Sequence, residues 1–96
     1  MKKHQISTAK EFNEKYKDFL VEGAYGLDID DVHVVRYLDK QFQDLILIPD
    51  FKYSQIKLKF GTCRFYTDLS IMKTVHERRS IIEKHIDDYF RSKEKI

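Results

Sequence analysis

The fold expected for this chain of 96 residues follows from the sequence FKYSQIKLKFGTCRFYT at residues 51–67. Apolar and polar side chains alternate along it on both sides of Gly61, a pattern typical of two antiparallel strands joined by a tight turn. We take Gly61-Thr62 as the turn residues, and the expected cross-strand pairs are then Phe60 with Cys63, Leu58 with Phe65, and Ile56 with Thr67. The sequence therefore predicts one amphipathic β-hairpin over residues 53–68, with these six side chains on its inner face.

Helical periodicity predicts two helices before this hairpin. Thr8 and Glu11 have the spacing of a capping box, and apolar residues continue at helical spacing towards Gly23, which suits a left-handed helix end. Asp30 is the expected N-cap of the second helix, which should span residues 31–47 and stop ahead of a proline.

A third helix of roughly two dozen residues is expected from Ser70 onward, because apolar residues share one arc of about 100° there. These residues are Ile71, Met72, Val75, Ile82, Ile86, Tyr89 and Phe90. The polar side of this helix offers pairs of opposite charge four residues apart: Lys73–Glu77, Arg79–Glu83, Lys84–Asp88 and Asp87–Arg91. Such pairs make a helix soluble and stabilise it slightly.

Together these elements predict a small α+β fold, a single domain over residues 1–96 in the order α-α-β-β-α, with a two-stranded antiparallel hairpin packed against three helices. The ends, residues 1–5 and 92–96, are expected to fray. Both edges of a two-stranded sheet are open. A second copy could therefore add its own hairpin and form a four-stranded sheet across a homodimer axis.

The composition is that of a folded protein, with 42% hydrophobic and 35% charged residues. One cysteine leaves no internal disulfide, and no charged-then-apolar segment opens the chain, so we expect a reducing, cytoplasmic setting. No apolar run approaches the roughly 20 residues of a membrane span, so we expect no membrane among the partners. Lys outnumbers Arg 13 to 5, a bias expected of an AT-rich bacterial or viral coding sequence.

The net charge of +2 hides two opposed blocks of charge. Residues 27–50 contain six acids against Arg36 and Lys40, whereas residues 51–67 contain four bases and no acid. A segment of net charge −4 is therefore followed directly by a segment of net charge +4.

No residue spacing in the chain supports a metal, a cofactor or a catalytic site. The sequence DIDD at residues 28–31 is similar to the start of a calcium loop, but His33 stands where that loop requires glycine. His76 and His85 lie half a turn apart on the predicted third helix and cannot share a metal. Cys63 is expected to face inward as a small apolar group. We expect no small-molecule substrate.

The outer face of the predicted hairpin carries Lys57, Lys59, Arg64 and Tyr66. Bases interleaved with an aromatic ring are the combination that phosphate attraction and base stacking require. Lys and Arg on an exposed strand also keep a sheet edge soluble, which is the alternative explanation. In a third reading, the acidic segment neutralises this face within the fold.

Arg79 is the unusual residue of the third helix, because its position falls inside the apolar arc. A charge there must be paired or must extend to solvent. One interpretation packs its stem on the core while the guanidinium reaches an acid of residues 27–50. The other keeps Arg79 for a carboxylate or phosphate of a partner.

The sequence thus favours a non-catalytic intracellular interaction or regulatory module that binds a protein partner, or a second copy, through charge-polarised surfaces. Three apolar residues off the core stripes, Val21, Tyr37 and Ile81, offer area that a partner could cover. The alternative is a nucleic-acid-binding protein that uses the basic and aromatic face of residues 53–68. An enzyme would need a pocket that brings Asp30 or Asp31 beside His33 or His85. The acidic second helix argues against insertion into a DNA major groove.

Overall fold

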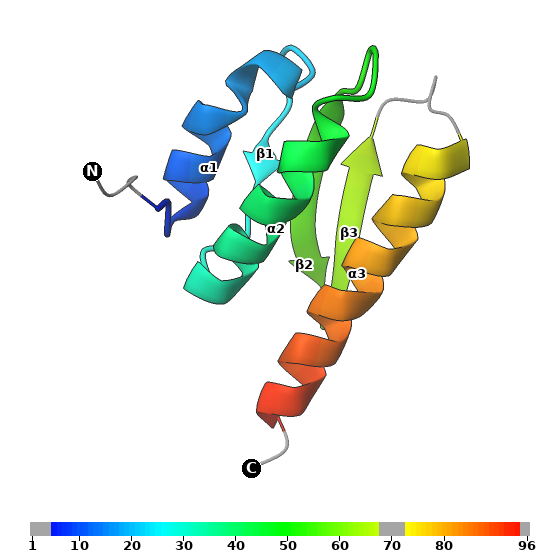
Figure 1. The fold of residues 1–96 in the computed structure, drawn as a ribbon. Coiled ribbons are helices and arrows are strands. Elements are labelled where there is room, and N and C mark those ends of the chain that lie inside the picture. Colours follow the sequence, from blue (N-terminus) through cyan, green and yellow to red (C-terminus); the bar gives the residue numbers. More distant parts are fainter. Residues whose placement is uncertain (1–4, 68–72, 95–96) are drawn as a thin grey trace.

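A computed structural model describes residues 5–67 and 73–94 (Figure 1). It confirms a small α+β domain. Along the chain, the described elements are α1 (Ala9–Lys15), the short 3-10 helix η1 (Lys17–Phe19), β1 (Gly26–Leu27), α2 (Val32–Leu45), β2 (Tyr53–Lys59), β3 (Thr62–Thr67) and α3 (Lys73–Glu94). The expected start of the third helix at Ser70, with Ile71 and Met72, lies outside the described residues.

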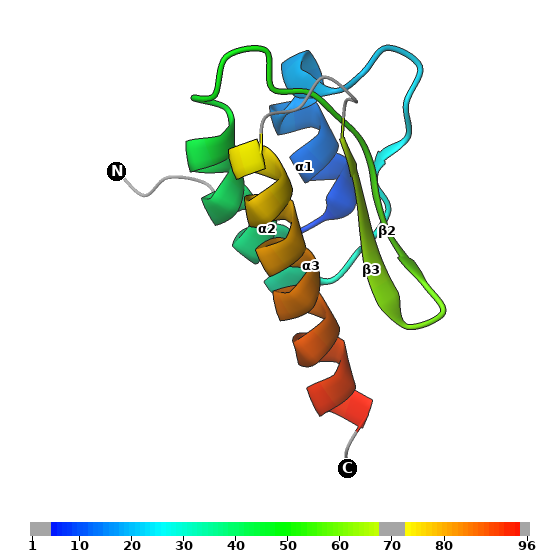
Figure 2. The ribbon, with the colours of Figure 1, turned by 90° about the vertical axis from the view of Figure 1, so that its right-hand side faces the viewer.

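The sheet has three strands rather than the two expected, in the order β1-β2-β3. β2 and β3 form the predicted antiparallel hairpin, while β1 pairs parallel to β2, with Gly26 opposite Gln55 and Leu27 opposite Ile56. Two residues are too few to show a periodic pattern, so β1 could not be predicted from the sequence. Figures 1 and 2 show α1, α2 and α3 on one face of this sheet.

The turn of the hairpin lies one residue earlier than predicted. Lys59 pairs with Thr62, so the turn residues are Phe60 and Gly61, with φ of 54° and 77°. Positive φ at both positions defines a type I′ turn, whose twist matches that of the flanking strands. The cross-strand pairs become Leu58 with Cys63 and Ile56 with Phe65. Each partner shifts by two residues, so Ile56, Cys63 and Phe65 stay on the inner face as predicted, whereas Phe60 is 92% exposed in the turn and Leu58 is 38% exposed.

Phe42 of α2 lies at the centre of the core and is fully buried. Its ring contacts rings from every layer of the fold, at centroid distances between 4.8 and 5.9 Å: Phe12, Tyr16, Phe51, Tyr53 and Phe65. On α3 the predicted stripe contributes Val75, Ile82 and Ile86 as buried residues, with Tyr89 and Phe90 partly buried. Burial of this cluster fixes α2 across the sheet.

The first helix is shorter than predicted. Thr8 caps it as expected, since its hydroxyl accepts from the backbone N–H of Glu11 at 3.1 Å. The helix ends at Lys15, however, and does not continue towards Gly23. Beyond η1, Leu20 forms a parallel bridge with Tyr53, and the N–H of Val21 donates to the Tyr53 carbonyl at 2.8 Å. Pairing with β2 therefore overrides the helical pattern of this segment.

The second and third helices differ from prediction at their ends. Asp31, not Asp30, caps α2, and its Oδ1 accepts from the N–H groups of His33 and Val34. Asp30 instead accepts from the N–H of Ala9, at the start of α1. α2 ends at Leu45, because backbone N–H groups that follow donate to carbonyls three residues back, as in a 3-10 turn, ahead of the proline.

α3 extends to Glu94, so residues 92–94 are helical rather than frayed. Lys93 holds this end of the helix in place. Its Nζ lies 3.3 Å from Oδ2 of Asp31 and over the rings of Tyr89 and Phe90.

Side chains from helices occupy both edges of the sheet. At the β3 edge, the N–H of Cys63 donates to Asp87, and the N–H of Phe65 donates to Oε2 of Glu83 at 2.7 Å. At the β1 edge, the side-chain amide of Asn13 accepts from the N–H of Leu27 at 2.7 Å and donates to the Leu27 carbonyl at 3.0 Å. The edge-to-edge dimer expected from an open hairpin therefore lacks free backbone groups at these positions.

The same contacts change the charge pairs of α3. Because Glu83 and Asp87 turn towards β3, the expected pairs Arg79–Glu83 and Asp87–Arg91 do not form within residues 73–94. Of the four predicted pairs, the described residues show Lys84–Asp88, at 3.4 Å.

We expect Gly26→Ala to lower the free energy of unfolding by about 1–2 kcal/mol more than Gly23→Ala. Both glycines have positive φ, 76° and 80°, so both variants carry similar backbone strain. A Cβ at Gly26 would lie 2.4 Å from Oδ1 of Asn13 and would displace the amide that bonds Leu27, whereas a Cβ at Gly23 meets open space. Urea unfolding of the two variants measures the difference, and equal losses would contradict this role of Asn13.

Candidate functional site

The outer face of the hairpin brings the four predicted residues together. Lys57 lies directly opposite Arg64 across the two strands, Lys59 follows Lys57 on the same strand, and Tyr66 lies opposite Gln55. Their neighbours along the strands, Ile56, Cys63 and Phe65, are buried under the helices, so the alternation of strand side chains directs the four outward. Tyr66 keeps 42% of its surface exposed.

The cations of this face have no acidic partner among the described residues. The acids of residues 27–50 bind elsewhere: Asp31 pairs with Lys93 at 3.3 Å, Asp39 with Lys15 at 2.8 Å, and Asp44 with Arg78 at 3.5 Å. The acidic segment therefore does not neutralise the hairpin within the described fold. Lys57 and Arg64 are instead like charges in directly opposed positions, an arrangement that destabilises a strand pair.

Aromatic rings accompany these cations. The Nζ of Lys57 lies 5.8 Å from the ring centroid of Tyr66, and the Nζ of Lys59 lies 5.7 Å from that of Phe60. Phe60 is 92% exposed at the turn, although the predicted register placed it inside beside Cys63. The sequence prediction missed Phe60 because the alternation of apolar and polar residues is the same for both turn positions. It therefore could not show that Phe60 stands in the turn rather than in the strand. The signal that could have found it is the preference of type I′ turns for glycine at their second position.

Arg79 is partly buried, and its Nε has no hydrogen-bond partner in the described structure. Among the described residues it forms no ion pair. Its neighbour Arg78 is the residue that reaches the acidic segment, at Asp44. The expected pairing of Arg79 with that segment is therefore not found, and its reservation for a partner stays a prediction.

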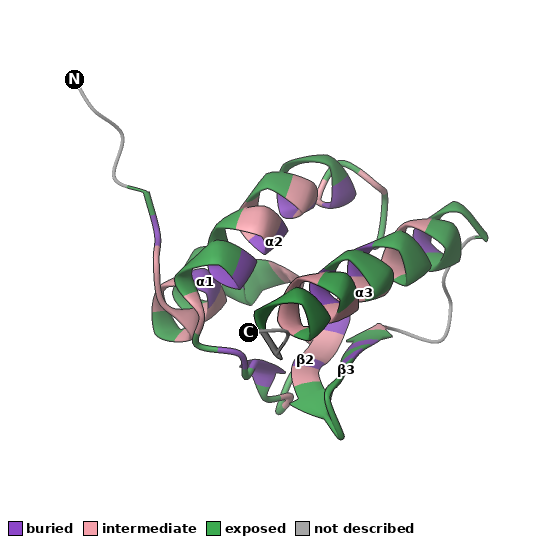
Figure 3. Cartoon of the chain, turned by 90° about the horizontal axis from the view of Figure 1, so that it is seen from below, coloured by how far each residue is buried: buried purple, intermediate pink, exposed green. Residues whose placement is uncertain are grey.

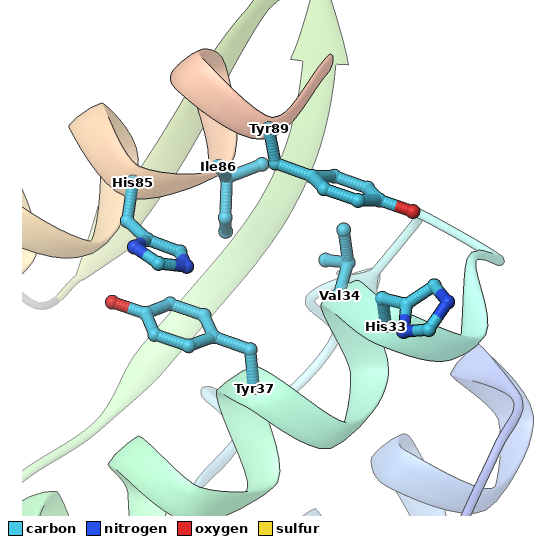
Figure 4. A pocket seen from close by; sticks show the side chains of 6 residues that line it. All are labelled: His33, Val34, Tyr37, His85, Ile86 and Tyr89. Carbon is cyan, nitrogen blue, oxygen red and sulfur yellow. The ribbon is translucent and has the colours of Figure 1, made fainter. Parts of the chain in front are cut away.

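A small pocket lies between α2 and α3 (Figure 4). It has a volume of about 60 Å³ and is lined by His33, Val34, Tyr37, His85, Ile86 and Tyr89. The rings of Tyr37 and His85 stack, with centroids 4.1 Å apart, so Tyr37 faces α3 and is not free for a partner. The volume admits a few water molecules and lies far below the roughly 300–1,000 Å³ of sites for small molecules.

Asp31 lies at the edge of this pocket, where the enzyme alternative requires an acid beside a histidine. Both its carboxylate oxygens accept from the Tyr89 hydroxyl at 3.3 Å, besides capping α2. Burial raises the pKa of this carboxyl, but hydrogen bonds from the Val34 N–H and from Lys93 outweigh burial and lower it. Asp31 is therefore ionised and committed to structure at neutral pH.

The thiol of Cys63 is 2% exposed on the inner face of β3. Burial, together with the charges of Glu83 and Asp87, raises its pKa to about 12. The thiol is therefore protonated near neutral pH and behaves as a small apolar group.

Residues 5–67 and 73–94 contain neither a cluster of metal ligands nor a membrane-spanning helix. There, no group of three or more His, Cys, Asp or Glu side chains lies close enough together to hold a metal ion. No helix there combines the length and the apolarity needed to cross a membrane.

Comparisons with known proteins identify no relative of this chain. No family model matches the chain, and neither curated proteins nor solved structures include a significant match to it.

We expect the free energy of unfolding to fall between pH 9 and pH 10, by up to about 1.4 kcal/mol, through Cys63. The thiol titrates near pH 9 once unfolded but near pH 12 when folded. The unfolded chain therefore releases this proton first, and rising pH favours unfolding. Urea unfolding from pH 8 to pH 10 measures the slope.

The control is Cys63→Ala, which is less stable at all pH values and should lose less further stability between pH 9 and pH 10, where the buried hydroxyls of Tyr16 and Tyr53, whose pKa values burial also raises, still contribute. Equal slopes in the two proteins would contradict the raised pKa of this thiol.

Proposed function

We propose that this protein is a non-catalytic interaction or regulatory module that binds a macromolecular partner through a charge-polarised surface. The observation that carries the proposal is the unpaired state of Lys57, Lys59 and Arg64 among the described residues. Anionic groups of a partner would relieve the repulsion between Lys57 and Arg64, which no acidic side chain on the described outer face offsets. The proposal places the protein in the cytoplasm, a setting that suits one unpaired cysteine.

The partner in this proposal is another protein or a second copy of this chain. Ile81, on the outer side of α3, is 65% exposed and offers apolar area to a partner that also reaches the helix side of the molecule. Val21 is partly buried and Tyr37 packs against His85, so these two contribute little. Because the sheet edges carry helix side chains, a dimer would use the outer face rather than strand pairing.

A non-catalytic role is supported by the chemistry of the described groups. The pocket between α2 and α3, at about 60 Å³, leaves too little room for a substrate, and the wider depression of about 670 Å³ along α1 has neither histidine nor cysteine in its lining. Cys63 is protonated and buried, and Asp31 is held by Tyr89 and Lys93. None of these groups is available as a nucleophile or a general acid.

Nucleic acid is the second candidate partner. The observation that favours it is the position of aromatic rings beside unpaired cations, Tyr66 beside Lys57 and Phe60 beside Lys59. Phosphates attract the cations, while bases stack on exposed rings.

We expect Lys57→Glu/Lys59→Glu to weaken partner binding at least about tenfold, or about 1.4 kcal/mol. The measurement is affinity capture from source lysate on the immobilised protein, followed by titration of the recovered partner. The matched control is Lys10→Glu/Lys40→Glu, which changes the net charge equally at exposed sites on α1 and α2. Partner binding by the control but not by the hairpin variant is the expected result. Equal loss in both variants would overturn the assignment of the binding surface.

A further inference from the structure

The turn between β2 and β3 holds a bulky aromatic residue in a backbone conformation that disfavours it. Phe60 has φ of 54°, in the left-handed region, at a position where type I′ turns favour Asn, Asp or Gly. Its side chain is 92% exposed, so the residue gains almost no burial inside this chain. Backbone strain of this kind concentrates at binding and switch sites.

The position of the turn makes Phe60 available to a ligand. Figure 2 shows the end of the hairpin away from the three helices, and Figure 3 marks this end as exposed. Lys59 contacts the Phe60 ring from the adjacent strand position. Tyr66 lies about 16 Å away along the strand, judged from the five residue steps that separate its partner Gln55 from Phe60. The Tyr66 ring and three unpaired cations therefore lie on the outer face, and the Phe60 ring is exposed at the turn where this face ends.

This surface matches a polymer that alternates planar rings with negative charges. An acidic peptide would satisfy Lys57, Lys59 and Arg64 but would leave the two rings without flat partners. In a duplex, the faces of the bases are already covered by stacking. A single strand offers both phosphates and free base faces, so it uses every exposed group of the hairpin.

We propose that the outer face of the hairpin binds single-stranded nucleic acid, with Phe60 and Tyr66 stacking on bases and Lys57, Lys59 and Arg64 contacting phosphates. The inference rests on the second candidate of the proposed function. It assigns to Phe60 a role in binding that the fold itself does not require.

The test measures stability and binding in the same variant. Phe60→Asn suits the left-handed position, so we expect a higher melting temperature than that of the parent protein. The same variant should bind labelled dT12 or U12 at least about fivefold more weakly in fluorescence anisotropy, because stacking on one base is lost. Phe60→Trp, which keeps a stacking ring, should retain affinity.

Salt dependence tests the phosphate contacts. Three contacts predict a log–log slope of about −2 for the parent protein between 50 and 200 mM salt. Lys57→Glu/Lys59→Glu should abolish binding or reduce this slope, while Lys10→Glu/Lys40→Glu should leave it unchanged.

The outcomes separate this inference from the proposed function. Binding of dT12 that is weakened by Phe60→Asn and kept by Phe60→Trp supports the inference. Binding unaffected by Phe60→Asn overturns the stacking role, and tighter binding to a 12-base-pair duplex overturns single-strand selection. If neither dT12 nor U12 binds at 50 mM salt, the nucleic-acid inference fails. The proposed interaction module is then tested by the affinity capture alone.

Discussion

The burial of Phe42 is the interaction on which the rest of the structure depends. Its ring meets Phe12 and Tyr16 on one side and the sheet residues Tyr53 and Phe65 on the other. Removing this ring from water therefore requires α2 to lie across the inner face of the sheet. With α2 in the middle, α1 and α3 take the flanks, which is the arrangement in Figure 1. The flanking positions place both helices beside an edge of the sheet.

From these positions, side chains of α1 and α3 form hydrogen bonds with backbone groups at the two edges of the sheet. Asn13 bonds both backbone groups of Leu27, and Glu83 and Asp87 accept from the outward N–H groups of β3. Each contact satisfies an edge group that would otherwise face water or another strand. In the described structure the same contacts leave Arg79 without the helix partner expected of it. With the inner face covered and the edges bonded at Leu27, Cys63 and Phe65, the outer face, the turn and the part of the β2 edge next to the turn are the parts of the described sheet left uncovered.

The sequence predicted the helices and strands of the fold better than the turns and helix ends that connect them. The hairpin, its two faces, the cap at Thr8 and the stripe of α3 follow from periodicity, which many residues report together. The turn could not be placed by alternation, because a shift of two residues leaves every side chain on the same face. The acids of residues 27–50 form a block along the chain but not in space. A helix turns successive acids towards different neighbours, so Asp39 meets Lys15 while Asp44 meets Arg78.

The protection of an open sheet edge explains the basic outer face only in part. Lysines on strands often protect an open edge from pairing with another chain. Here Asn13, Glu83 and Asp87 already occupy edge positions, whereas β1 covers β2 only at Gln55 and Ile56, so this purpose applies to the cations near the turn rather than to the whole face. Opposed like charges oppose strand pairing, and a left-handed Phe60 strains the turn next to them. These two unfavourable features, which have neither an acidic partner nor burial inside the described fold, are accounted for if a partner brings negative charges to Lys57 and Arg64 and a planar group to Phe60.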